Sequence, residues 1–178
     1  KNRLRLLIKN NIMNEDLNNK EAVDKLISLV KDINVAVFCT ELTKTPLQSR
    51  PMSVQDVDDQ GNLWFISSAN SNKNFEILKD NQVQLFFANN SSSQYISIYG
   101  TASIYKDQSI IDELWTPVAK AWFEEGKKDP NVTVIKVTPS DAYYWDTKDG
   151  KIISLLKMAG SAIFGTTADI GVEGKLKL

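Results

Sequence analysis

Stretches rich in β-branched and aromatic residues recur along the chain, and in several of them apolar and polar positions alternate as in half-buried β-strands. These stretches are 34–42, 50–57, 63–68, 82–90, 95–107 and 132–147. The last of them is either one long bent strand or a pair of strands. The segment "DDQGN" at 58–62 is a turn, so the strands on either side of it are predicted to form a hairpin.

Clear helical patterns occur at three places. Residues 18–32 carry an apolar stripe at helical spacing, 68–81 contain a short helix that Ser71 is placed to cap, and 107–123 form a helix broken at Pro117. Because regular helices do not separate consecutive strands, the pattern argues against a doubly wound parallel sheet. It favours a mainly β protein, an antiparallel β-barrel with peripheral α-helices.

The rest of the chain completes the predicted organisation. Gly100 lies in the middle of a long strand and predicts a bulge or bend there. Residues 1–17 are interpreted as a short N-terminal arm or helix, and 18–178 as a single domain. Within that domain, 152–164 is a strand or a helix, and the tail 165–178 is expected to be a loop.

Composition limits the cellular compartment and the classes of binding partner that we expect. The net charge is −1, so no long-range attraction to nucleic acid is expected. The single cysteine, Cys39, rules out a disulfide within the chain and favours a reducing, cytoplasmic setting. No apolar run reaches the about 18–20 residues that a membrane-spanning helix needs, and "LLI" near the N-terminus is too short for a secretory signal.

The chain contains no histidine. This excludes Ser-His-Asp and Cys-His catalysis and nearly all zinc and non-haem iron sites. The acidic segment "DVDDQGN" lacks the glutamate that closes a calcium loop, so we interpret it as a turn and expect no metal site. Chemistry at neutral pH then requires another acid or base, or an organic cofactor.

Four polar residues are placed to bind a phosphate group. Arg50 opens the first strand of the predicted hairpin and Ser67 closes the second, while Ser71 and Lys73 follow at the start of a short helix. A helix N-terminus, a guanidinium fork, an ammonium group and two hydroxyls suit a phosphate. The alternative is a capping serine beside two solvated cations. The chain has no glycine-rich phosphate loop.

Aromatic residues suggest a second buried surface. In "AYYWDT" three adjacent aromatic residues, Tyr143, Tyr144 and Trp145, must point to both faces of a strand. One face can belong to the barrel core, and the other predicts a further contact such as a subunit interface, where aromatic residues are favoured.

Several blocks together resemble a known family. The blocks "SRPMSVQDVDDQGNLWFISSANSNKNFEIL", "YISIYGTASIYKD", "ELWTPVAKAWFEEGKKDP" and "VTPSDAYYWD" resemble the general stress protein branch of the pyridoxamine 5′-phosphate oxidase-like family. The resemblance runs from about residue 18 to the C-terminus. It implies a six-stranded antiparallel split barrel of the FMN-binding type and a homodimer with FMN at the subunit interface, although FAD is not ruled out as the cofactor.

The resemblance also implies roles for individual residues on the first hairpin strand. By the family pattern, Arg50 would hold the FMN phosphate. The residues after it would lay their backbone along the isoalloxazine ring; they are Pro51, Met52 and Ser53.

Further cofactor-binding residues are implied on later segments. Ile66 and Ser67 would continue the flavin site, and Ser71, Asn72 and Lys73 fall where the family has its second phosphate-binding block. Asn72 is uncharged where a basic residue often stands in the oxidases, which would weaken the grip on the phosphate.

The same pattern reaches the strand 95–107. Tyr95 and Ser97 lie on a strand that often approaches the flavin from one subunit or the other, and Trp145 is a candidate for the interface or the flavin side.

The implied function is an FMN-dependent oxidoreductase of unassigned substrate, with NADH or NADPH as candidate electron donor. The alternative is a flavin-binding stress protein without turnover that acts as a store, sensor or scavenger. Pyridoxamine phosphate oxidases carry a C-terminal Arg-x-His block for their substrate, whereas this chain has no histidine and its tail has no arginine. Oxidation of vitamin B6 is therefore not expected.

Overall fold

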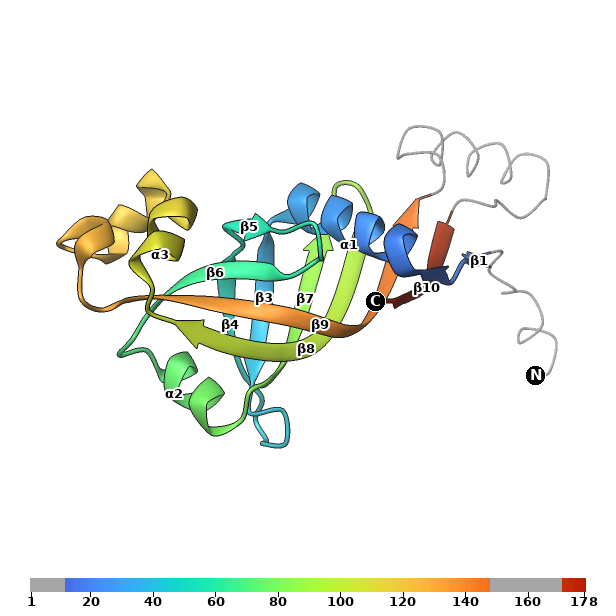
Figure 1. Ribbon diagram of the computed structural model, residues 1–178. Helices are drawn as coiled ribbons and strands as arrows, with labels where there is room; N and C mark the ends of the chain where they lie inside the picture. Colours follow the sequence, from blue (N-terminus) through green and yellow to red (C-terminus); the bar gives the residue numbers. More distant parts are fainter. Residues whose placement is uncertain (1–11, 148–170) are drawn as a thin grey trace.

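The computed structural model describes residues 12–147 and 171–178, and its strands form one strongly curved sheet with helices at the rim (Figure 1). The elements in chain order are β1 (Ile12–Asn14), β2 (Leu17–Asn18), α1 (Asn19–Ile33), β3 (Val35–Thr40), β4 (Gln48–Ser53), β5 (Asp56–Val57), β6 (Leu63–Ser68), α2 (Asn72–Lys79), β7 (Gln82–Asn89), β8 (Gln94–Tyr105), α3 (Gln108–Leu114), the 3₁₀ turns η1 (Pro117–Trp122) and η2 (Gly126–Lys128), β9 (Val132–Thr147) and β10 (Gly171–Lys177).

The sheet curls round on itself without closing. Neighbouring strands follow the path β4-β3-β7-β8-β9, all antiparallel, and β6 pairs with the first half of β9. Within the described ranges β4 and β6, at the two ends of this path, are not paired with each other. The expectation of a mainly β protein with an open, antiparallel barrel and peripheral helices is confirmed. The count of six strands is not confirmed: within residues 12–147 and 171–178, ten strands join the sheet.

The predicted hairpin between 50–57 and 63–68 is wrong for most of its length. Of residues 50–57, only β5 pairs with β6, through Asp56 opposite Trp64 and Val57 opposite Leu63. The stretch that contains Arg50 belongs instead to β4, which pairs with β3. β4 ends at Ser53, and the two-residue strand β5 follows it before the turn at 58–62. Because the chain is interrupted between β4 and β5, β4 itself does not pair with β6, and a gap remains between these two strands.

The strands β8 and β9 are the longest in the sheet, with 12 and 16 residues. Residues 132–147 therefore form one long strand, which resolves the two alternatives. The register between β8 and β9 shifts at Tyr99/Gly100, as the glycine predicted. A Cβ at Gly100 would lie 2.3 Å from the carbonyl oxygen of Thr138, so the close approach of the two strands requires glycine.

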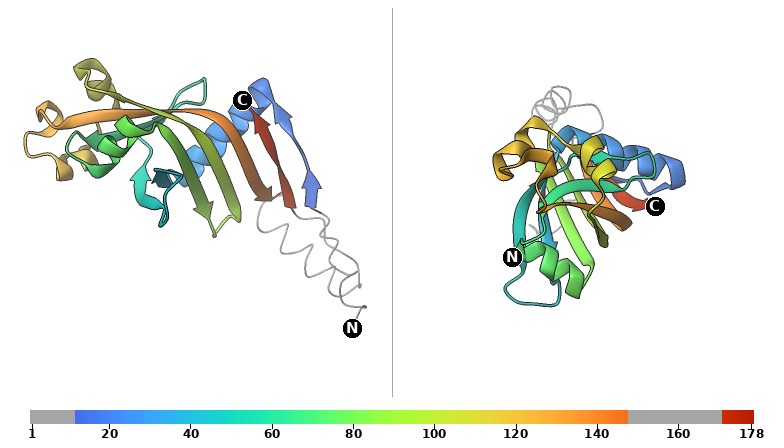
Figure 2. Two further views of the ribbon diagram at one scale, coloured as in Figure 1. Left: turned by 90° about the horizontal axis from the view of Figure 1, so that it is seen from below. Right: turned by 60° about the vertical axis from the view of Figure 1, so that its left-hand side comes forward.

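Two hydrophobic clusters hold the elements together. The larger one fills the inside of the curved sheet, where the rings of Phe38 and Phe65 meet edge to face at 5.4 Å, and α1 closes it with Leu26 and Leu29. The smaller one packs α3 and Phe123 against the first half of β9. Figures 1 and 2 show α1 along one rim of the sheet and α3 with η1 at the far end of β9.

The C-terminal residues form a strand, so the expectation of a loop is wrong for 171–177. β10 pairs antiparallel with β9 and parallel with both β1 and β2, so the predicted N-terminal arm contributes strands to the same sheet. Its buried residues, Val172, Gly174 and Leu176, alternate with more exposed ones. Because the middle buried position is a glycine, only Val172 and Leu176 mark the apolar face, and this short pattern concealed the strand in the sequence.

Some expectations concern residues outside the described ranges: the strand or helix at 152–164, and the turn that the letters DGK predict at 149–151. Among the helices that the structure describes, none is long and apolar enough to cross a membrane.

The packing of β10 against the N-terminal segment gives a first prediction. A Cβ at Gly174 would lie 2.1 Å from the backbone oxygen of Glu15, so Gly174→Ala forces β10 away from β1 and β2. Overpacking of this kind costs about 1–3 kcal/mol of unfolding free energy. We expect a lower denaturation midpoint in urea, whereas Lys175→Ala, at the exposed neighbouring position, leaves it nearly unchanged. Equal midpoints for Gly174→Ala and the wild type would contradict this packing.

Candidate functional site

The gap between β4 and β6 opens into a cleft of about 590 Å³. It lies between the unpaired edges of these strands, the start of α2 and the η1 segment. Its lining residues are Arg50, Pro51, Met52, Ser53, Gln55, Ile66, Ser67, Ser68, Lys73, Thr116, Val118, Ala119, Trp122 and Phe123. The cleft thus brings together seven of the eleven cofactor-binding residues predicted from the sequence. They meet across the gap between β4 and β6, and not in the hairpin that the sequence predicted.

Strand β4 forms one wall of the cleft with its backbone. It is an edge strand because it pairs with β3 on one side only, and Pro51, opposite Val37, lacks the N–H that a ladder on the other side would use. Residues on both of its faces line the cleft, Arg50 and Met52 on the inner face and Pro51 and Ser53 on the outer one. The open edge of the backbone therefore faces the cleft.

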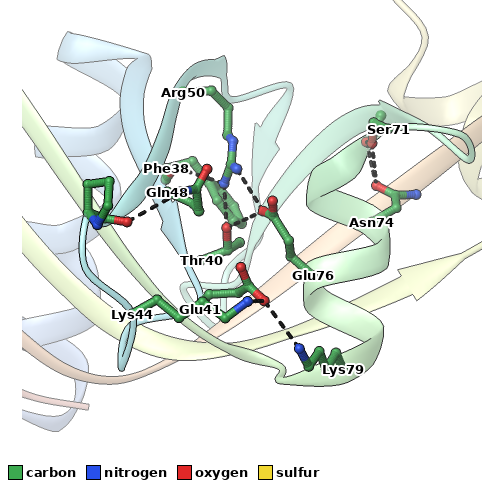
Figure 3. Close-up of polar contacts among 12 residues, drawn as sticks. Phe38, Thr40, Glu41, Lys44, Gln48, Arg50, Ser71, Asn74, Glu76 and Lys79 are labelled. Atoms are coloured by element: carbon green, nitrogen blue, oxygen red, sulfur yellow. Dashed lines mark hydrogen bonds and ion pairs between the residues drawn. The ribbon is translucent and has the colours of Figure 1, made fainter.

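Arg50 carries the positive charge at one end of the cleft, and it is held by three acceptors. Its Nη1 donates to the hydroxyl of Thr40 at 2.6 Å and to the carbonyl oxygen of Phe38 at 3.4 Å, and its Nη2 donates to Glu76 Oε2 at 2.7 Å (Figure 3). The Thr40 hydroxyl in turn donates to the same Glu76 oxygen at 2.5 Å. Arg50 is thus neither a solvated surface charge nor free of partners.

Glu76 was not predicted from the sequence as a site residue. It lies one helical turn after Lys73 on α2, and only this spacing relates it to the predicted cluster. Its contact with Arg50 spans 26 residues of chain, so the sequence alone does not reveal the pair.

Lys73 is the second cation of the cleft. Burial of its side chain lowers the pKa of the ammonium group, the nearby charge of Arg50 lowers it further, and Glu76 opposes both effects. Among the described residues no carboxylate lies within ion-pair distance of Lys73. It therefore offers an ammonium group, next to the guanidinium of Arg50, to an anion in the cleft.

A buried polar network fixes the start of α2 against the sheet. Ser67 donates to the side-chain oxygen of Asn74 at 2.6 Å, Asn74 donates to Thr133 at 2.9 Å, and Thr133 donates back to the carbonyl oxygen of Ser67 at 3.0 Å. All three side chains are buried. The network therefore holds Ser67 at the cleft in one defined orientation, with its hydroxyl hydrogen donated to Asn74.

Two residues of the predicted second phosphate-binding block lie outside the cleft lining. Ser71 is the N-cap of α2 by position, but its side chain makes no capping hydrogen bond, and its hydroxyl lies 3.3 Å from that of Ser67. Asn72, the first residue of α2, is exposed. Of this block, only Lys73 lines the cleft.

The wall opposite β4 was missed by the sequence analysis. It consists of Thr116 and the η1 residues Val118, Ala119 and Trp122, followed by Phe123. The Thr116 hydroxyl donates to Gln55 at 3.1 Å and so links this wall to the β4–β6 side. Val118 and Trp122 are 76% and 81% exposed, which leaves apolar surface at the mouth of the cleft. A kinked amphipathic segment at Pro117 was the only sequence signal for this wall.

Tyr95, Ser97 and Trp145 are not in the cleft of the chain that carries them. They lie on the outer face of the sheet, where Ser97 pairs laterally with Phe86 and Tyr143, and where the rings of Tyr143 and Trp145 are 4.8 Å apart. Tyr144 points to the opposite face and is buried, as the alternation predicted.

Other candidate groups have structural surroundings. Among the described residues no cluster of three metal-ligating side chains occurs. Burial raises the pKa of the Cys39 thiol, which suits an inert core residue. Burial, followed by the nearby carboxylates, raises the pKa of Tyr144 to about 12, and its hydroxyl donates to the carbonyl oxygen of Glu15.

The chain is similar in sequence to two known proteins. It is 26% identical over 160 residues to the protein bli-3 of Neurospora crassa, covering 84% of this chain and 77% of that protein. It is 28% identical to general stress protein 26 of Bacillus subtilis over 61 residues, which are 34% of this chain and 43% of that protein.

Solved structures share the fold. A candidate general stress protein 26 from Jannaschia sp. superposes with a TM-score of 0.72 at 24% identity, covering 89% of this chain and 98% of that one. A protein from Xanthomonas citri, described as a general stress FMN/FAD binding protein, superposes with a TM-score of 0.62 at 26% identity, covering 72% and 90%.

The sequence model of the family described as "Pyridoxamine 5'-phosphate oxidase like" matches residues 21–169, which include every residue of the cleft. The chain therefore belongs to the pyridoxamine 5'-phosphate oxidase-like family, as its sequence blocks indicated.

Proposed function

We propose that this protein is a flavoprotein that binds FMN in the cleft between β4 and β6. One observation carries the proposal: the cleft combines two cations at one end, Arg50 and Lys73, with an open strand edge along its side. The first feature suits a phosphate monoester and the second suits the heteroatoms of a flat ring. The Xanthomonas citri relative described as an FMN/FAD binding protein supports the same assignment.

The residues present fit the parts of FMN. Arg50 and Lys73 would hold the phosphate, with the N-terminus of α2 beside them. The backbone of Pro51–Ser53 would hydrogen-bond the edge of the ring, while Met52 and Ile66 would contact it with apolar groups. The phosphate cluster favours FMN over FAD, since the second half of FAD would have to pass beyond the two cations.

We further propose that the loaded protein is an oxidoreductase. A bound flavin supplies hydride and electron transfer, which explains how a chain without histidine could carry out redox chemistry. The role of the protein is then to bind, orient and shield the cofactor. The proposed substrate is a small acceptor reduced at the expense of NADH or NADPH.

A homodimer is part of this proposal. On the outer face of the sheet one lateral row runs over five strands, with Val37 and Phe86 at its centre; the row is Pro51, Val37, Phe86, Ser97 and Tyr143. Val37 and Phe86 are nearly half exposed, as is Trp145 beside the row. An apolar and aromatic surface of this kind suits a subunit contact. It begins at Pro51 in the cleft, so Tyr95 and Ser97 of one protomer would approach the flavin of the other.

The phosphate assignment predicts the effect of removing Arg50. Arg50→Ala is expected to weaken FMN binding about tenfold or more, because a charge-assisted hydrogen bond contributes about 1.5–3 kcal/mol. The affinity for riboflavin, which lacks the phosphate, should hardly change. Calorimetric titration of both ligands measures the difference. Lys79→Ala removes a cation from the same region outside the cleft and serves as the control. Equal losses for FMN and riboflavin would contradict the phosphate role.

The redox proposal predicts the colour and its response. The protein reconstituted with FMN should be yellow, should bleach under anaerobic NADH or NADPH, and should recover its visible absorbance on admission of oxygen. A yellow protein inert to both nucleotides would support a flavin store or sensor instead. A folded, colourless protein that ignores added FMN would contradict both functions.

The dimer proposal predicts a change of mass. Phe86→Glu places a charge at the centre of the outer row and should convert a dimer to a monomer in size-exclusion chromatography with light scattering. Leu78→Glu, at a more exposed apolar residue of α2 outside the row, should leave the dimer intact. A wild-type monomer at micromolar concentration would argue against the proposal.

A further inference from the structure

Glu76 presents a problem for a phosphate-binding cleft. Its carboxylate lies 2.7 Å from the Arg50 guanidinium, and charge counting alone says that it should repel the anion which Arg50 attracts. Both side chains are largely shielded from solvent, with 22% of Arg50 and 14% of Glu76 exposed. A largely shielded carboxylate beside an anion site requires an explanation other than surface charge.

The contacts of Arg50 divide its guanidinium into two edges. On the end of the group, Thr40 accepts from Nη1 and Glu76 accepts from Nη2. The carbonyl oxygen of Phe38 also accepts from Nη1. Among the described residues no acceptor bonds to Nε. Nε and the second hydrogen of Nη2 form the lateral edge of the fork, which is a bidentate donor pair for a carboxylate or phosphate.

Thr40 makes this arrangement rigid. It is fully buried, accepts from Arg50 at 2.6 Å and donates to Glu76 at 2.5 Å, so the three side chains form a closed triangle (Figure 3). Each member comes from a different element, Thr40 from β3, Arg50 from β4 and Glu76 from α2. The triangle therefore fixes α2, and with it Lys73, relative to the edge strand.

We infer that Glu76 and Thr40 are positioning residues of the phosphate site: they hold the end of the Arg50 guanidinium so that its Nε/Nη2 edge stays available to the phosphate. This inference rests on the proposed function. In the wild type, Glu76 remains bonded to Arg50 when the ligand binds. In a variant without Glu76, the gain from removing a negative charge near the phosphate does not compensate for the lost orientation of the Arg50 guanidinium. Preorganisation of the fork lowers the entropy that binding would otherwise cost.

A positioning role for Glu76 and a purely electrostatic role predict opposite changes in FMN affinity when Glu76 is removed. Glu76→Ala makes the cleft more positive by one unit, yet we expect FMN affinity to fall about tenfold, which corresponds to about 1.4 kcal/mol. Glu76→Gln keeps an oxygen that accepts from both Arg50 and Thr40 and should restore most of the affinity. Thr40→Val, which keeps the shape of the side chain, should weaken FMN binding in the same direction as Glu76→Ala.

Calorimetric titration with FMN and with riboflavin is the test, on full-length variants whose circular dichroism and melting are checked first. Riboflavin affinity should stay constant across the series, because a merely structural defect would lower both affinities. Glu41→Ala is the matched control: it removes an equal charge near α2, where Glu41 pairs with Lys44 and Lys79, without touching Arg50. It should leave FMN affinity unchanged or slightly higher.

Two results would overturn the inference, and they differ. If Glu76→Ala binds FMN as tightly as the wild type or more tightly, Glu76 acts by charge alone, and the proposed function stands without this role. If the folded wild type binds no FMN, the proposed function fails together with the inference that rests on it.

Discussion

The open seam between β4 and β6 is the constraint on which the rest of this structure depends. A sheet curved this strongly would close if its end strands could pair, and closure would remove the cleft. Two local features prevent it. Pro51 withholds an N–H from the open side of β4, and the chain leaves β4 after Ser53, so that only two residues reach β6. The unpaired backbone edges then become the walls of a cleft of about 590 Å³.

Polar groups at the end of this seam are held by buried networks rather than by surface charge pairs. The Arg50–Thr40–Glu76 triangle and the Ser67–Asn74–Thr133 network both attach α2 to the sheet. Fully satisfied buried networks are rigid and specific. Lys73 is on the same helix, and burial of its side chain, followed by the charge of Arg50, lowers the pKa of its ammonium group. The cleft is therefore preorganised at its cationic end and open, with exposed apolar side chains, at the η1 end.

The sequence predicted local features well and failed on long-range pairing. The helix before β3, the strands β6–β9, the bulge at Gly100 and the two-faced aromatic segment 143–145 follow from periodicity and turn residues, which act over a few positions. The partner of β4 does not, because a turn between two strands suggested a hairpin where the chain instead separates. The strand at 171–177 was not predicted for a related reason, since a short strand with glycine shows little alternation of apolar and polar residues.

The candidate site was predictable to a similar extent. Arg50, Ser67 and Lys73 stood out by residue type, and the family blocks added Pro51–Ser53 and Ile66. Glu76 and the η1 wall could not be found, because an ion pair across 26 residues and a wall of ordinary apolar residues leave no local signature.

The central claim is most directly tested by a crystal structure of the protein grown with FMN. The account predicts the phosphate on the Nε/Nη2 edge of Arg50 with the ring along Pro51–Ser53, and a flavin bound elsewhere, or with its phosphate away from Arg50, would contradict it.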